Sequence, residues 1–142
     1  MPMATFFIGG TKYAPARKLL DRGVTIALAT NVNPGSAMSE SAAFTFSLAC
    51  LQLRLTPAEA LVALTAGGAQ ALRRPDLGRL VAGAQADLVL WGCRTVAHLP
   101  WHCGVPHALA VVKRGRVAYS AAPAAAADCR AAIQRPPAPV LQ

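Results

Sequence analysis

A group of polar and conformationally special residues follows an apolar run in the first quarter of the chain. Directly after the apolar residues 24–29 come Asn31, Asn33, Gly35 and Ser36. Amide and hydroxyl groups can donate and accept hydrogen bonds, and a glycine lets the backbone come close to a ligand. These residue types are suited to holding a small polar molecule. Composition alone favours a simpler interpretation, an Asn-Pro-Gly turn of the kind that is common after strands.

The elements that must position this group follow an alternation of helix and strand. Residues 14–22 predict a short helix, because Pro15 lies near its first turn and Gly23 can end it. Residues 24–29 are continuously apolar, which predicts a strand buried on both faces, as in a parallel sheet. Residues 41–55 fit either helix or strand, and their length favours a helix.

The next helix has a clear start signal. Thr56 can cap it, Pro57 suits its first position, and Glu59 can reach back to the capping residue. Apolar residues on one face extend the predicted helix to about residue 72. Beyond residue 75 the pattern becomes that of a small β unit. It contains a strand over residues 86–91 and a hairpin around Arg114 and Gly115.

Composition and charge narrow the function classes. The 142 residues are 54% hydrophobic and 14% charged, with a net charge of +8. The basic residues are scattered rather than interleaved with aromatic ones, which disfavours nucleic-acid binding. No apolar run is long enough to span a membrane, and no signal peptide is recognisable. The four cysteines form no CxxC pair, so we expect a reducing, cytoplasmic setting.

Longer segments carry a family resemblance. They are "ATFFIGGTKYAPARKLLDRGVTIALATNVNPGS", "LRLTPAEALVALT", "GRLVAGAQADLVLW" and "VVKRGRVAY". Across roughly residues 4–119 the chain resembles the C-terminal part of the imidazolonepropionase family, within the metal-dependent amidohydrolase superfamily. The most specific piece is NPGS after a strand, in register with YAPARKLLDRG.

The resemblance implies an α/β fold, a (β/α)₈ TIM-like barrel joined to a small β-sandwich. A barrel of this kind needs about 250 residues. The implied architecture is therefore a C-terminal fragment, with the last βα units of the barrel in residues 1–75. Residues 76–119 would supply the C-terminal share of the β-sandwich, and the Ala- and Pro-rich residues 120–142 are expected to be disordered.

The resemblance also implies an activity. Members of this family open the ring C–N bond of 4-imidazolone-5-propanoate with metal-activated water, giving N-formimino-L-glutamate in histidine degradation. The implied cofactor is zinc or iron, and the implied partners are a small-molecule substrate and either a complementary N-terminal fragment or further copies of the chain. Two alternatives stay open: a non-catalytic remnant or subunit that folds against a complementary fragment, and a basic nucleic-acid-binding module.

The resemblance assigns roles residue by residue. Asn31 stands where the family has an aspartate that binds the metal and accepts a proton from the attacking water. An asparagine keeps an oxygen ligand but lacks the charge and the basicity of a carboxylate. Asn31 is thus the implied catalytic position and a degenerate metal ligand, and the chain is expected to be inactive alone. Asn33, Gly35 and Ser36 match the substrate-contacting positions.

The three histidines lie outside this motif. His98, His102 and His107 are four and five residues apart, with Pro100 and Pro106 between them. The prolines argue against one helix presenting all three, so we expect surface or interface histidines rather than a metal site.

Overall fold

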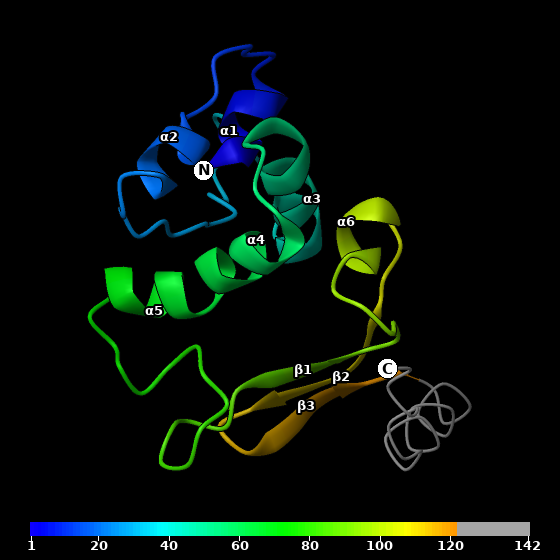
Figure 1. Cartoon of the computed structure of the whole chain (residues 1–142). Helices are drawn as coiled ribbons and strands as arrows, with labels where there is room; N and C mark the ends of the chain where they lie inside the picture. The colour runs from blue at the N-terminus through cyan, green and yellow to red at the C-terminus, as the bar shows by residue number, and fades with distance from the viewer. Residues whose placement is uncertain (122–142) are drawn as a thin grey trace, which may run out of the picture. The chain divides into compact units, whose positions relative to one another are not determined.

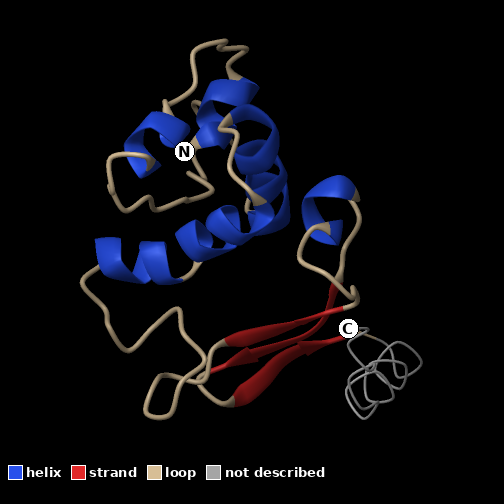
Figure 2. Cartoon of the chain, viewed as in Figure 1, coloured by secondary structure: helices blue, strands red, loops and turns tan. Residues whose placement is uncertain are grey.

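The computed structural model describes residues 1–121. The tail predicted to be disordered over residues 120–142 therefore lies outside the described residues except for Ser120, which ends a strand, and Ala121, whose N–H donates a hydrogen bond to Leu109 O. The chain divides into two compact units. The first, here called the helical unit, comprises residues 1–85 and 93–105. The second, the sheet unit, comprises residues 86–92 and, within the described part of the chain, residues 106–121. Figure 2 shows the helices in blue and the strands in red.

The helical unit is built around one central helix. Its helices are α1 (Pro2–Phe7), α2 (Ala16–Leu20), α3 (Ala42–Gln52), α4 (Pro57–Leu64), α5 (Ala66–Ala71) and α6 (His98–Trp101) (Figure 1). Helix α3 packs against α1, α4 and α6. Its Leu48 is buried with Met3 and Ala37, and Phe44 lies against this cluster. None of the helices between residues 1 and 121 has the length and apolar character that crossing a bilayer requires.

Side-chain hydrogen bonds cap the starts of α3 and α4. The hydroxyl of Ser41 accepts a hydrogen bond from Phe44 N at 3.0 Å and caps α3. At α4 the predicted capping box is present: Thr56 N donates to Glu59 Oε2 at 2.8 Å, and Glu59 N donates to Thr56 Oγ1 at 3.3 Å. The single helix predicted to residue 72 is instead two helices, because Thr65 adopts non-helical angles, φ −113° and ψ −90°.

The strand predicted after Gly23 does not form. Residues 24–30 form no regular secondary structure and belong to no sheet among the described residues, and Val24 is 45% exposed. The prediction of a strand buried on both faces is therefore wrong for this chain. A strand is buried in that way only when neighbouring strands and helices cover it. Here the segment contacts α4 through a hydrogen bond from Leu28 N to Ala63 O, 3.0 Å long.

Helix α5 approaches this segment closely. A Cβ atom at Gly67 would lie only 2.2 Å from the carbonyl oxygen of Ile26. Only glycine allows this approach. Glycine inside a helix costs about 1 kcal/mol relative to alanine, but at Gly67 it is what lets α5 pack on residues 24–30.

The sheet unit confirms the predicted β pattern. Its antiparallel strands β1 (Leu88–Trp91), β2 (Ala108–Lys113) and β3 (Arg116–Ser120) lie in the order β1-β2-β3. The β2–β3 turn places Arg114 at φ +51° and Gly115 at φ +73°, as a type I′ hairpin turn requires. Asp87 fixes this turn, because its carboxylate pairs with Lys113 and accepts a hydrogen bond from Arg114 N at 2.7 Å.

Candidate functional site

The four predicted site residues lie together in one loop of the helical unit. Asn31 follows the apolar residues 24–30 and adopts the left-handed conformation, φ +56°. Asparagine and aspartate tolerate this region better than other non-glycine residues. The Asn31 side chain reaches across the loop, where Nδ2 donates a hydrogen bond to Ser36 Oγ at 3.2 Å. The two ends of the predicted site are therefore joined directly.

Asn33 organises the tip of the same loop. Its Oδ1 accepts a hydrogen bond from Gly35 N at 2.8 Å, and its backbone exchanges hydrogen bonds with Ala37 at 2.9 and 3.0 Å. Asn33, Pro34 and Gly35 are exposed. This geometry is that of an Asx turn, so the turn interpretation of the motif is correct as a description of the loop. It leaves the exposed tip accessible, and contact with a substrate stays a prediction.

The loop does not by itself match a metal centre. A catalytic zinc site takes several nitrogen, sulfur or carboxylate ligands. Asn31 offers one neutral amide oxygen. Within residues 1–121, no set of three His, Cys, Asp or Glu side chains converges at this loop. The donor set therefore does not fit a zinc or iron ion without ligands from elsewhere.

Two of the histidines share one turn of helix. His98 begins α6 and His102 directly follows it, with ring centroids 5.3 Å apart. Pro100 does not interrupt this turn, because it occupies the first turn of α6, where its missing N–H has no helical partner. The prediction that one helix does not present all three histidines is confirmed, since His107 lies outside α6. His107 belongs to the sheet unit, where its carbonyl accepts a hydrogen bond from Gly92 N at 2.8 Å.

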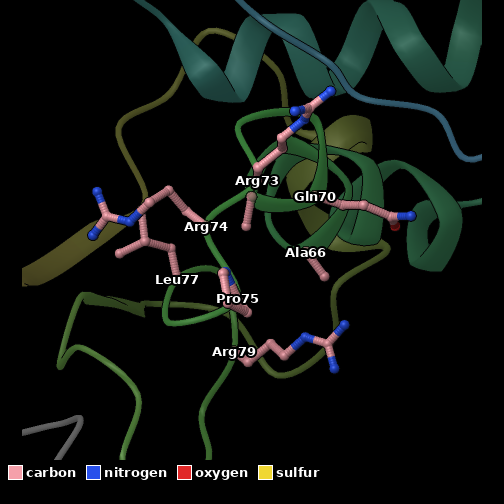
Figure 3. Close-up of a pocket in the computed structure, with 8 residues that line it drawn as sticks. Ala66, Gln70, Arg73, Arg74, Pro75, Leu77 and Arg79 are labelled. Atoms are coloured by element: carbon pink, nitrogen blue, oxygen red, sulfur yellow. The ribbon is translucent and has the colours of Figure 1, made fainter.

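Two hollows in the helical unit were not predicted as sites. One, of about 510 Å³, lies between residues 24–26 and helices α4 and α5. The other, of about 230 Å³, is lined by Arg73, Arg74 and Arg79 among others (Figure 3). The three guanidinium groups point away from one another in Figure 3. Arg74 is hydrogen-bonded to Asp76 and lowers the pKa of that carboxyl group. The arginines of this hollow are therefore not arranged to bind a single anionic ligand together.

Comparison with known proteins gives the chain its relatives. The model of the amidohydrolase family matches residues 7–120. An imidazolonepropionase from Anaeromyxobacter dehalogenans is 66% identical over 130 residues, and one from Myxococcus xanthus is 49% identical over 118 residues. The matches cover 92% and 83% of this chain. The chain spans only 31% and 28% of the length of those two proteins.

Solved structures show the same relationship. Atrazine chlorohydrolase from Arthrobacter aurescens, crystallised with zinc, matches 92% of this chain with a TM-score of 0.72 and 26% identity. The match covers 34% of that enzyme. Escherichia coli guanine deaminase shares the fold, with a TM-score of 0.66 over 84% of this chain and 33% of its own. The resemblance deduced from the sequence is thus confirmed, and the chain belongs to the amidohydrolase family.

Proposed function

We propose that this chain forms part of an imidazolonepropionase-type hydrolase. Such an enzyme opens the ring C–N bond of 4-imidazolone-5-propanoate with water and releases N-formimino-L-glutamate. The observation that carries the proposal is the 66% identity to an imidazolonepropionase over 130 residues. Because the chain spans 31% of that relative, it would supply one share of the enzyme, with zinc or iron and the remaining ligands contributed by other segments.

The architecture proposed for this share follows the family. Residues 1–75 would be the last βα units of a (β/α)₈ barrel, and residues 76–119 part of a β-sandwich. Residues 24–30 support this proposal, because an apolar segment that belongs to no sheet among the described residues is suited to pairing with further strands. The partner would be a complementary N-terminal segment or another copy of the chain, in the cytoplasm.

Within the loop, we assign substrate contact to Asn33, Gly35 and Ser36. The exposed Asx turn supports this assignment, because it presents amide and hydroxyl groups on a fixed backbone. Asn31 would occupy the position of the proton acceptor. An amide cannot accept that proton near neutral pH, so the chain as it stands should support little ring opening. This feature favours the second candidate function, a non-catalytic subunit with the same fold.

A chimera tests both candidates. This chain replaces the matching 130 residues of the Anaeromyxobacter dehalogenans protein, and the loss of 4-imidazolone-5-propanoate is followed by its ultraviolet absorbance. A second chimera carries Asn31→Asp in addition. A correctly placed proton acceptor commonly contributes 10²–10⁴-fold to a rate, so we expect the Asn31→Asp chimera to open the ring faster than the unsubstituted chimera by about that factor. The two chimeras are also compared for bound metal.

The control is Asn33→Ala in the Asn31→Asp chimera. We expect it to raise KM, because a substrate contact is lost while the proton acceptor remains. Equal rates for the chimeras with and without Asn31→Asp would show that Asn31 does not occupy the proton-accepting position. Inactivity of both chimeras, when both are folded, would favour the non-catalytic candidate.

A further inference from the structure

A histidine pair is held on one face of helix α6. His98 is the first residue of α6 and His102 directly follows its last, and His102 N donates a hydrogen bond to His98 O at 2.9 Å. Side chains four residues apart in a helical turn lie on the same face. The two rings are at 81° to one another, and their ligand nitrogens lie within 4.8 Å of each other.

The turn that carries the pair is fixed from both sides. Leu99, between the two histidines in sequence, is 5% exposed, and α6 packs on α3. The residues before the helix are tied to Thr95, whose hydroxyl accepts a hydrogen bond from Ala97 N at 3.0 Å. Its carbonyl accepts another from His98 N at 3.1 Å. A ligand bound by the pair would therefore not have to order the backbone.

We propose that His98 and His102 form a binding site for a divalent transition-metal ion. Imidazole nitrogens are ligands that Zn²⁺, Cu²⁺ and Ni²⁺ prefer. Each zinc–nitrogen bond is about 2.0–2.1 Å, so two such ligands in a tetrahedral site stand about 3.3 Å apart. Rotations of the two side chains bring the nitrogens from their present separation to this one. Water completes the coordination, and the site is independent of the proposed ring opening.

Trp101 provides a reporter for this site. Its indole is 79% exposed and its centroid lies 5.8 Å from that of His98 and 6.0 Å from that of His102. Cu²⁺ held by these rings would quench the fluorescence of so close an indole. The chain has two tryptophans, so replacing Trp91 by phenylalanine leaves Trp101 as the only indole.

The test titrates the Trp91→Phe chain with Cu²⁺ while its fluorescence is recorded. We expect saturable quenching with one ion per chain, reversed by an excess of the chelator EDTA, whereas Zn²⁺ should compete only weakly because Cu²⁺ binds imidazole sites more tightly. Loss of an outer-shell partner commonly lowers metal affinity 10–100-fold, so losing a direct ligand, in His98→Gln or His102→Gln, should weaken binding at least about tenfold. Cys103→Ser is the matched control, since it removes the neighbouring exposed thiol, and it should leave binding unchanged.

Two results would overturn the proposal: quenching curves that are the same with and without the glutamine substitutions, or binding that is lost in Cys103→Ser alone. Circular dichroism checks that each variant is folded. If the glutamine variants do not fold, proton NMR of the unsubstituted chain decides. Substoichiometric Cu²⁺ should then broaden the ring protons of His98 and His102 first, and uniform broadening of all three histidines would refute the site.

Discussion

Replacing each of two adjacent glycines by alanine should have opposite effects on stability. At Gly67, the new Cβ atom would lie 2.2 Å from the carbonyl oxygen of Ile26 and 3.2 Å from that of Val62. Both obstacles are backbone atoms, which cannot rotate away as a side chain can. At Gly68, the nearest atom would be the carbonyl oxygen of Ala63 at 3.9 Å, an ordinary contact.

The magnitudes follow from two opposing terms. Overpacking costs about 1–3 kcal/mol, and the backbone obstacles put Gly67→Ala at the upper end. Alanine gains about 1 kcal/mol over glycine inside a helix. We therefore expect Gly67→Ala to lower the free energy of unfolding by about 2 kcal/mol. Gly68→Ala, with the propensity term alone, should raise it by up to about 1 kcal/mol.

Thermal unfolding followed by circular dichroism at 222 nm measures both variants. In a domain of 60–100 residues, each kcal/mol moves Tm by about 4–8 °C, so the two variants should separate by more than 10 °C. The double variant should show the sum of the two effects if the glycines act independently. A Gly67→Ala chain as stable as Gly68→Ala would show that α5 does not pack on the Ile26 carbonyl.

Three further outcomes are expected. The Thr56 backbone N–H and the Arg17 guanidinium lower the pKa of Glu59. The carboxylate therefore stabilises the fold fully above the ordinary glutamate pKa, and this contribution disappears as the pH falls through the lowered pKa. Glu59→Gln should make Tm depend less on pH in the acid range. Asp87→Ala removes the carboxylate that accepts the Arg114 N–H of the hairpin turn, and it should cost about 0.5–1.5 kcal/mol in a urea titration because water can replace this exposed acceptor. Lys113→Ala, which removes only the exposed ion pair with Asp87, should cost under about 1 kcal/mol in the same titration. The chain alone should self-associate, because residues 24–30 belong to no sheet among the described residues and Val62 on α4 is 57% exposed. Light scattering measures the mass of the species in solution, and a single monomeric species at micromolar concentration would contradict this expectation.

The parts of the fold that the sequence predicted are those determined by neighbouring residues. The capping box at Thr56 and the turn at Arg114 and Gly115 depend on contacts within four residues, so the residue types alone indicate them. The break at Thr65 was not predictable in this way. The break allows α5 to pack on residues 24–30, and Gly67 and Ile26 in this contact are about forty positions apart in the sequence. A local sequence pattern does not predict a contact between residues so far apart.

The error over residues 24–29 has a related cause. A continuous apolar run predicts that a segment suits burial on both faces. It does not identify the strands and helices that would bury it, or whether they belong to the same chain. In the described residues, Leu28 is buried while Val24 is 45% exposed. The pattern is therefore informative about the environment that the segment fits and not about the residues that supply it.

The hydrogen bond between Asn31 and Ser36 decides whether the Asn31→Asp comparison can be interpreted. An aspartate adopts the left-handed conformation as asparagine does, so the substitution adds no backbone strain. Asn31 donates to the Ser36 hydroxyl at present, and that hydroxyl can rotate and donate to a carboxylate instead. The loop thus keeps a hydrogen bond between positions 31 and 36 when the amide becomes a carboxylate. A change in the ring-opening rate can then be attributed to the charge and basicity of the carboxylate. Ser36→Ala removes this hydrogen bond from the chimeras with and without Asn31→Asp. If it abolished the difference between their ring-opening rates, the residue at position 31 would have to act through the shape of the loop rather than through proton transfer.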